Sequence, residues 1–321
     1  MTLRLAVRRA EWLAHVHATV AAYGPALVPV VKGNGYGFGR PVLHEVSGQL
    51  STQICVGTIH EVHGVPPGLQ PVVLTPGLQP PPRADAVVTV GHPAHVAALA
   101  GWKGPVLVKL ASSMQRHGTA PAHLPGLLAA LAAAGLPITG YSIHLPLAGT
   151  DHDRVAEVEA WLAHLPTDGL PLWVSHLSPS AFHSLQAAHP ARPMRVRVGT
   201  ALWHGTPRGP FLHLGADVLS TRTVRAGDLA GYRLTQIPGD GTLVMVGCGS
   251  AHGVTPLPHD DPSQRSPFHF ARRRLPLLEP PHMHTSMCLV PHGQPAPGVG
   301  EIVDVQQPLI NVHPDELEWL P

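Results

Sequence analysis

The chain has 321 residues, enough for one large domain, or a large and a small one, with a substantial core. Its charged fraction is 13% and its formal net charge is +1, so the composition shows no electrostatic footprint for nucleic acid or a membrane surface, and we expect a small-molecule partner. The cysteines are too few and too widely spaced for a disulfide framework, and the N-terminus lacks a signal-peptide pattern, so we expect a cytoplasmic protein.

Short apolar or β-branched runs predict eight strands in the first 200 residues. Between several of them, apolar residues recur at spacings of three and four, which predicts helices. Strands and helices that alternate in this way are typical of a (β/α)8 or TIM barrel, with a doubly wound sheet as the competing fold. The predicted strands are 27–31, 53–58, 71–75, 86–90, 105–110, 138–144, 171–177 and 194–199, and the predicted helices include 9–23, 95–100, 124–134 and 154–165.

The pattern of predicted elements changes after about residue 210. Short strand-like runs such as 242–246 and 301–305 are separated by Gly, Pro and Asp turns, without long helices. We therefore predict a barrel over residues 8–212 and a mostly-β domain over residues 213–321, which residues 1–7 would join. Residues 259–284, with several arginines among prolines, are predicted to form an exposed or partly ordered loop.

Lys32 is the first candidate for chemistry. It directly follows the predicted strand 27–31 and precedes a glycine-rich segment, residues 33–39. At the carboxyl end of a barrel strand, where active sites of this fold lie, desolvation can lower a lysine pKa and favour a Schiff base; a surface lysine in a turn is the plainer alternative. Other residues lie at or just after the ends of later predicted strands and should converge on the same mouth: Arg116, His144, Ser180, Arg197, Gly199 and Thr200.

Six segments together resemble the motifs of the alanine racemase family, in order and in spacing. These enzymes are two-domain members of the fold-type III group that use pyridoxal 5′-phosphate (PLP). The resemblance covers roughly residues 3–310 and implies a homodimeric racemase that interconverts L- and D-alanine or another small amino acid. The segments are VVKGNGYGFG (30–39), VKLASSMQRHG (108–118), GYSIH (140–144), SHLSPSA (175–181), RVGTALWHG (197–205) and VRAGDLAGY (224–232).

The resemblance also implies a role for each matched residue. Lys32 would bond PLP as a Schiff base and act as the base on one face of the substrate, while Tyr232, supplied across the dimer interface, would act on the other face. Arg197 would face the pyridine nitrogen. The remaining implied roles are phosphate binding by Tyr36, Ser180, Gly199 and Thr200, a supporting network through His144, substrate binding by Arg116 and Met287, and possible carbamylation of Lys109.

The chain departs from the family pattern at several places. Cys248 stands where the family has a tyrosine, Cys288 stands where it has an aspartate, and the chain ends early, at Pro321. Two alternatives therefore stay open. His282, His284 and Cys288 could form a zinc site, since imidazole and thiolate suit zinc, in a lyase of the same fold type; or the chain could be a non-catalytic PLP-binding homologue.

Overall fold

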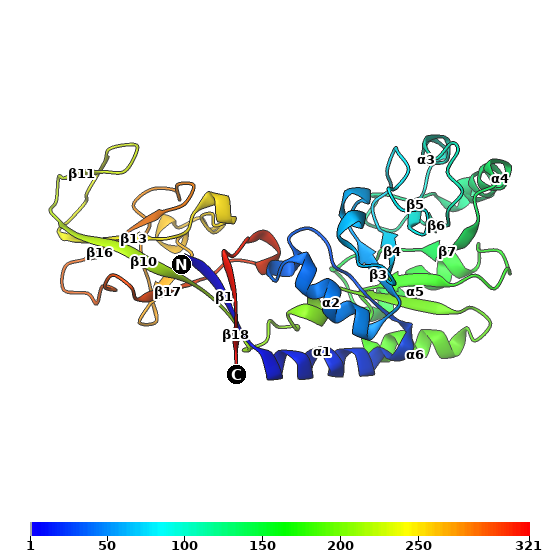
Figure 1. Ribbon diagram of the computed structural model, residues 1–321, viewed down its shortest axis with the longest axis horizontal. Coiled ribbons are helices and arrows are strands. Elements are labelled where there is room, and N and C mark those ends of the chain that lie inside the picture. The colour runs from blue at the N-terminus through cyan, green and yellow to red at the C-terminus, as the bar shows by residue number, and fades with distance from the viewer. Residues whose placement is uncertain (1) are drawn as a thin grey trace. The chain divides into compact units, whose positions relative to one another are not determined.

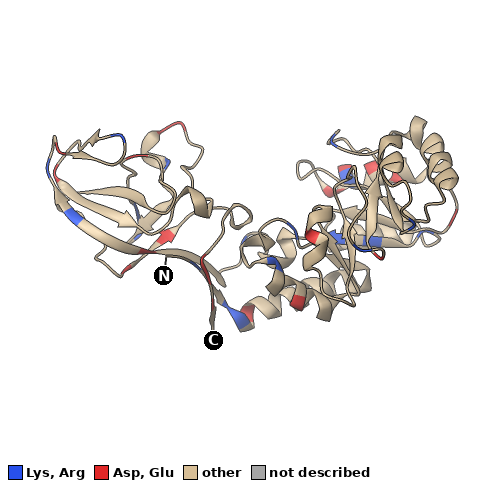
Figure 2. Ribbon diagram, turned by 45° about the horizontal axis from the view of Figure 1, so that its top comes forward, with Lys and Arg blue, Asp and Glu red and all other residues tan. Residues whose placement is uncertain are grey.

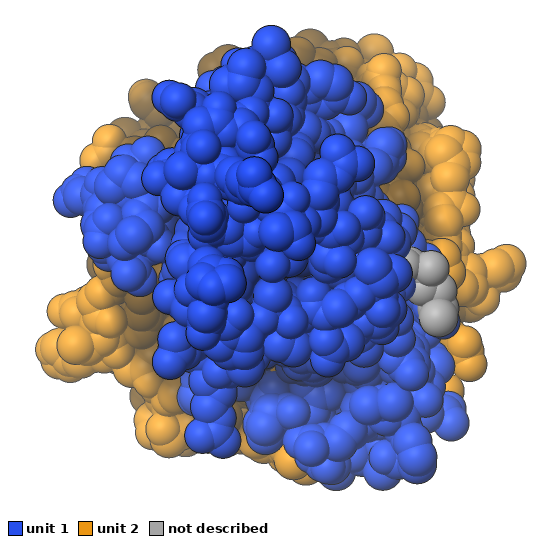
Figure 3. Space-filling model, turned by 90° about the vertical axis from the view of Figure 1, so that its left-hand side faces the viewer, with its two compact units in different colours: residues 1–14, 34–39, 207–321 blue, residues 15–33, 40–206 orange. Residues whose placement is uncertain are grey.

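The structure is a computed structural model and describes residues 2–321. By their contacts the described residues group into two units, which we treat separately (Figure 3). The barrel unit comprises His15–Gly33 and Arg40–Thr206. The β unit comprises the segment that ends at Ala14, Asn34–Gly39 and Pro207–Pro321.

The barrel unit contains one sheet of eight parallel strands, in the order β2-β9-β8-β7-β6-β5-β4-β3 (Figure 1). The sheet closes on itself, because Val30 beyond β2 forms a parallel bridge with Cys55 of β3. The predicted (β/α)8 barrel is therefore confirmed, and each of the eight predicted runs overlaps a strand. The strands are β2 (Leu27–Pro29), β3 (Gln53–Val56), β4 (Gln70–Val73), β5 (Val87–Val90), β6 (Val106–Lys109), β7 (Ile138–Ser142), β8 (Leu172–Ser175) and β9 (Met194–Val198).

The barrel strands are short and valine-rich because both of their faces are covered. Every residue of β5 and β6 is buried, which is typical of a parallel sheet with helices outside and packed side chains inside. The polar exception in β5, Thr89, donates its hydroxyl hydrogen to Val73 O at 2.6 Å. Gly140 lets β7 and β8 approach, since a Cβ there would lie 2.6 Å from Pro171 O.

Seven α-helices lie in the first 203 residues, and local sequence sets several of their ends. Thr150 and Asp153 form a reciprocal capping box at the start of α5, and Gly135, with φ of 65°, ends α4. Among residues 2–321, no helix is long and apolar enough to cross a bilayer. The helices are α1 (Arg9–Tyr23), α2 (Arg40–Leu50), α3 (Pro93–Ala98), α4 (Leu124–Ala134), α5 (Asp151–Leu162), α6 (Pro179–Ala188) and α7 (Thr200–Trp203).

The β unit is built on a sheet in the order β15-β14-β17-β10-β1-β18, and β10 also pairs with β13, which pairs with β16. This confirms the predicted mostly-β second region. Strand β1 lies between antiparallel β10 and parallel β18, the last strand of the chain. The strands are β1 (Leu3–Arg8), β10 (Leu212–Val224), β13 (Gly241–Val246), β14 (Phe268–Phe270), β15 (Arg273–Arg274), β16 (Ser286–Pro291), β17 (Ile302–Val305) and β18 (Glu316–Leu320), with a separate hairpin of β11 (Leu229–Ala230) and β12 (Thr235–Gln236).

Two segments differ from the sequence prediction. The prediction of an exposed or partly ordered loop over residues 259–284 is wrong for part of this stretch, which contributes β14 and β15 and buries Phe268 completely. Residues 34–39 belong by contacts to the β unit, where the Asn34 side-chain amide donates to Leu309 O at 2.8 Å. The exact bounds of the two predicted domains stay a prediction.

Short 3-10 helices connect several of these elements. Two of them matter for the site: η2 (Gly35–Gly37), directly after the Lys32 loop, and η3 (Ile59–Gly64), directly after β3. The others are η1 (Gly24–Ala26), η4 (Pro121–His123), η5 (Ser250–His252), η6 (Pro262–Gln264) and η7 (Leu309–Asn311).

Candidate active site

Lys32 lies at the carboxyl end of the first barrel strand, as predicted. The backbone just before it is held on both sides: Val30 N–H donates to Val198 O at 2.9 Å, and Val31 N–H donates to Cys55 O at 2.8 Å. The side chain is solvent-accessible, yet enough protein surrounds it to lower its pKa, through burial first and then the positive charge of Arg116. A lowered pKa increases the neutral, nucleophilic form of the amine.

Glu61, on η3, holds the loop that begins at Lys32. Its carboxylate accepts hydrogen bonds from Gly33 N–H at 3.1 Å and from Gly57 N–H at 2.6 Å. Gly57 has little room for a side chain, since a Cβ there would lie 3.0 Å from the Glu61 carboxylate and 3.2 Å from Lys32 Cβ. Sequence reasoning missed Glu61, because nothing near it in the chain distinguishes it from a surface acid.

Arg197, on β9, is buried inside the barrel unit. Its guanidinium donates to Ile143 O at 2.7 Å and to the Ser142 hydroxyl. Burial lowers the pKa of Arg197 to about 10, which still leaves it positively charged at neutral pH. These contacts fix a permanent cation at the carboxyl end of β7 and β9.

Lys109, the last residue of β6, is also buried. Burial, followed by the charges of Arg197 and Arg116, lowers the pKa of Lys109 to about 6. The amine is therefore mostly neutral at pH 7, unlike an ordinary lysine. A small hollow brings Lys109 together with Arg116 and His144, and its other lining residues are Ser112, Met114 and His117.

His144 follows β7 and is neutral in this setting. Burial first, and then the charge of Arg197, lowers its pKa to about 2. Its Nδ1 lies 2.8 Å from the Ser175 hydroxyl, and its ring centroid lies 4.9 Å from that of His176. His176 was missed from the sequence; its φ of 60° is uncommon for a residue other than glycine and is of the kind found at functional sites.

The barrel mouth is therefore rich in basic groups. Figure 2 shows several Lys and Arg positions, coloured blue, along the ribbon of the barrel unit. A positive charge disfavours protonation of a neighbouring base, so Arg197 helps to lower the pKa values of Lys32, Lys109 and His144. Such a mouth is suited to an anionic ligand.

The predicted phosphate-binding residues lie in three places. Ser180 is exposed in the first turn of α6, with its hydroxyl 3.1 Å from that of Ser178, the N-cap residue. Gly199 and Thr200 form the start of α7, where no side chain caps the helix. Tyr36 is buried on η2, with φ of 56°, in the segment that groups with the β unit. Their shared role stays a prediction.

Tyr232 lies at the tip of the β11–β12 hairpin in the β unit, and 86% of its surface is exposed. Its backbone N–H donates to the buried carboxylate of Glu279 at 3.0 Å, and its ring centroid lies 4.4 Å from that of His282. Met287 packs against a hydrophobic cluster of the same unit, so its observed contacts are those of a packing residue. The cluster comprises Val224, Ile237, Leu243 and Leu289.

The structure does not support the zinc site that the sequence left open as an alternative. His282 Nε2 is hydrogen bonded to Glu279, Cys288 is completely buried in β16, and the His284 ring contacts His252. Within residues 2–321, no group of three His, Cys, Asp or Glu side chains is placed to hold a metal ion. The alternative was wrong because closeness in sequence does not bring side chains on a strand and a turn together.

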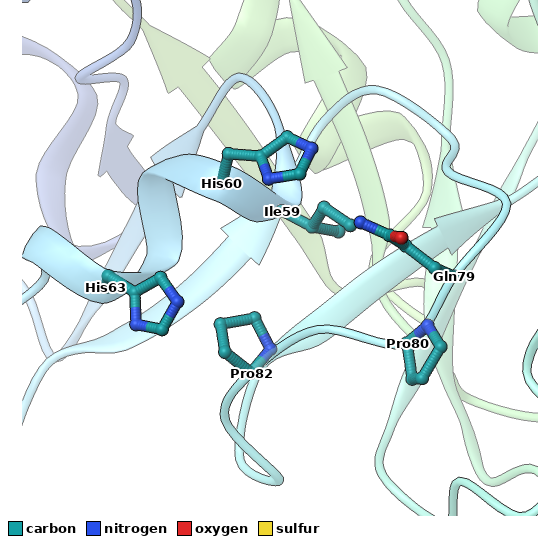
Figure 4. Close-up of a pocket in the computed structure, with 6 residues that line it drawn as sticks. All are labelled: Ile59, His60, His63, Gln79, Pro80 and Pro82. Atoms are coloured by element: carbon teal, nitrogen blue, oxygen red, sulfur yellow. The ribbon is translucent and has the colours of Figure 1, made fainter.

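The barrel unit also has a cavity of about 340 Å³ beside η3 (Figure 4). Two histidines of η3 and residues of the loop after β4 line it, and none of them is a predicted site residue. This cavity therefore shares no lining residue with the candidate active site. The lining residues are Ile59, His60, His63, Gln79, Pro80 and Pro82.

Comparisons with known proteins agree with this geometry. The model of the alanine racemase N-terminal domain family matches residues 10–207. Alanine racemases of Mycobacterium bovis and Mycobacterium tuberculosis are each 28% identical over 264 residues, covering 71% of this chain and 67% of the relative.

Solved structures share the fold. The alanine racemase from Bartonella henselae, described with covalently bound pyridoxal phosphate, has a TM-score of 0.74 at 19% identity and covers 100% of both chains. The alanine racemase from Streptomyces lavendulae has a TM-score of 0.72 at 18% identity and covers 100% of this chain and 97% of its own. With a family model that spans more than half of its length and a closed eight-stranded barrel, this chain belongs to the alanine racemase family of amino-acid racemases.

Proposed function

We propose that the protein is a PLP-dependent racemase that interconverts the L- and D-forms of alanine or another small amino acid, with Lys32 and Tyr232 as its two acid/base groups. The observation that carries the proposal is the position of Lys32 at the carboxyl end of a closed barrel, with a lowered pKa. The covalently bound pyridoxal phosphate of the Bartonella henselae relative supports the choice of cofactor.

The residues of the barrel mouth fit PLP chemically. Lys32 provides an amine for a Schiff base, the Ser180 hydroxyl and the uncapped amides of α7 are donors of the kind a phosphate needs, and Arg197 provides a fixed cation for the ring nitrogen. When bound, PLP would delocalise the negative charge left on the substrate Cα after its proton is removed. An adjacent permanent cation such as Arg197 would disfavour protonation of the ring nitrogen.

Racemisation requires a proton to leave Cα on one face and return on the other, so two groups must flank a planar carbon. Lys32, whose pKa is lowered by burial, can take and return a proton through its amine. Tyr232 can donate and accept a proton through its phenol hydroxyl. We assign one face of the substrate to each of them.

Lys109 is suited to the predicted carbamylation. Its neutral amine can attack CO2, forming an N–C bond and releasing one proton, which leaves a carbamate with one negative charge. A pKa of about 6 makes this form available at pH 7. The new anion would offset the charge of Arg116 and orient it for the carboxylate of the substrate.

We further propose a homodimer in which Tyr232 acts on the partner's site. Tyr232 and its hairpin neighbours Leu229 and Leu234 are exposed by 86%, 60% and 64%, and Met283, next to His282, is exposed by 65%. Apolar side chains gathered around a reactive residue are typical of an interaction surface. The three free, buried cysteines are consistent with the cytoplasmic location that forms part of this proposal.

The visible absorption spectrum after PLP addition and desalting tests the proposal first. We expect a retained band in the wild type and none in Lys32→Ala. Chiral analysis of an amino-acid panel should then show racemisation. A band without turnover on any amino acid would favour the non-catalytic alternative, and the absence of a band in both proteins would refute PLP binding through Lys32.

A further inference from the structure

The hairpin that carries Tyr232 is tied to one buried acid. Glu279 is 6% exposed, and its carboxylate accepts from Tyr232 N–H at 3.0 Å and from Arg233 N–H at 3.4 Å. The Thr235 hydroxyl donates to the same carboxylate at 3.3 Å. Two successive backbone amides that point at one anion form a small nest, so this carboxylate organises the turn of the hairpin.

Gly231 allows this close approach. It has φ of 79°, and a Cβ there would lie 2.2 Å from Glu279 Oε1. Burial raises the pKa of Glu279, but the hydrogen bonds from His282 and from the two amides outweigh burial, and the pKa is lowered overall. Glu279 is therefore charged at neutral pH, as an acceptor for several donors should be.

His282 connects this acid to the Tyr232 ring. Its Nε2 is hydrogen bonded to Glu279, and its ring lies against the ring of Tyr232 at 4.4 Å between centroids. The backbone of His282 is itself fixed, since its N–H donates to Thr285 O at 2.9 Å and its carbonyl accepts from Ser250 N–H at 2.7 Å. The imidazole thus has one edge on the buried acid and packs against the exposed phenol with the two ring planes tilted by 46°.

We propose that Glu279 and His282 are positioning residues for Tyr232: the buried acid fixes the backbone of its turn, and the imidazole fixes the direction of its ring. This inference rests on the proposed role of Tyr232 in racemisation. It explains how a side chain with 86% of its surface exposed can still be held in one place before it meets a substrate. A displacement of about 1 Å in a catalytic group can cost on the order of 100-fold in rate, so the pair should matter although neither residue touches the reacting atoms.

The first test needs no activity. Hydrogen–deuterium exchange of the free protein should be about tenfold or more faster over residues 231–235 in Glu279→Gln, because the loss of charge weakens the bonds to both amides. Asp240→Asn is the matched control. Asp240 accepts one backbone N–H, that of Ala226 at 2.9 Å, so its variant should affect residues near 226 and leave 231–235 unchanged.

The second test uses the holoenzyme with Cα-deuterated D- and L-substrates. In Tyr232→Phe, one enantiomer should still exchange its Cα deuterium for hydrogen from H2O through Lys32 and the other should not, which identifies the enantiomer that Tyr232 deprotonates. Glu279→Gln should keep the PLP band, lose about 10- to 100-fold in turnover, and raise the primary isotope effect for that enantiomer alone. A residue that merely stabilised the fold would change both directions alike.

Two variants of His282 separate its hydrogen bond to Glu279 from its ring contact with Tyr232. They also provide the test if Glu279→Gln does not fold. His282→Gln keeps a donor for Glu279 but loses the ring, and His282→Phe keeps the ring but loses the donor. We expect the one-sided isotope effect in His282→Gln and the faster hairpin exchange in His282→Phe. Wild-type exchange over 231–235 together with wild-type isotope effects in these variants would overturn the inference. If Tyr232→Phe racemises normally, the proposed function fails instead, and the exchange data still report on Glu279 by themselves.

Discussion

The two proposed acid/base groups have opposite surroundings. Lys32 stands in a barrel mouth where burial and neighbouring arginines already lower its pKa. Tyr232 stands on a hairpin tip, 86% exposed, with an ordered backbone beneath it and no comparable enclosure of its phenol within the β unit. The comparison teaches that the barrel unit changes the pKa of its acid/base group, whereas the β unit fixes only the position of Tyr232.

Lys32→Ala is the change expected to have the largest effect. Without the amine neither a Schiff base nor the base on its face can form, so racemisation should fall by about 10⁴-fold or more. Chiral chromatography of the product measures this, and Lys103→Ala, which alters an exposed lysine, is the control. Comparable activity in both variants would show that the barrel mouth does not prepare Lys32 for catalysis.

Tyr232→Phe should have the next largest effect. Removal of one general acid/base typically costs about 10²- to 10⁴-fold, while the PLP band should persist because Lys32 is untouched. Racemisation rates and the visible spectrum of the same sample test this. Loss of the band along with activity would contradict the separation of roles between the two units.

Lys109 should make stability depend on pH. Its pKa is about 6 in the folded protein against an ordinary value of 10.5, so between these values the unfolded chain holds a proton that the folded chain does not. The free energy of unfolding should therefore rise with pH across this window, by up to about 1.4 kcal/mol per pH unit. It should fall again by the same amount per unit as the pH is lowered toward 6. Urea unfolding at pH 7, 8 and 9 in CO2-free buffer should show a steeper rise in the wild type than in Lys109→Met; equal slopes would refute a neutral buried lysine.

Leu234→Ser should have the smallest effect on folding. The side chain is 64% exposed, so the free energy of unfolding at low protein concentration should change by no more than about 0.5 kcal/mol. If a second copy covers the hairpin, sedimentation should show a larger fraction of monomer in the variant. An unchanged dimer would mean that the hairpin face lies outside the interface.

Much of the barrel could be predicted, because its strands are local apolar runs and its best helices are strongly periodic. Helices 9–23 and 124–134 were predicted with the bounds of α1 and α4. The prediction failed at residues 259–284, where prolines and arginines concealed Phe268, which contributes to the core of the β unit. It did not name α2 and α6, whose sequences both contain proline, serine and histidine, residues that weaken the helical pattern.

The site was predicted unevenly for a similar reason. Lys32, Arg197 and His144 lie at or just beyond the carboxyl ends of barrel strands, so the rule that places active sites at these ends could select them. Glu61 and Glu279 could not be found, because each acts through backbone amides at a distance along the chain; Tyr232 and Glu279 are separated by 47 positions. No local sequence pattern indicates that an acidic side chain accepts hydrogen bonds from backbone amides far away in the chain.

By itself, the sequence determined the alternation of strands and helices and the position of Lys32 directly after a strand, because both depend on neighbouring residues alone. Only the tertiary structure decided that the pKa of Lys109 falls to about 6, that His282, His284 and Cys288 are not grouped to hold a metal ion, and that a buried acid holds the Tyr232 hairpin. Desolvation, charge and hydrogen bonding are properties of groups brought together in space, and residues far apart in the chain supply them.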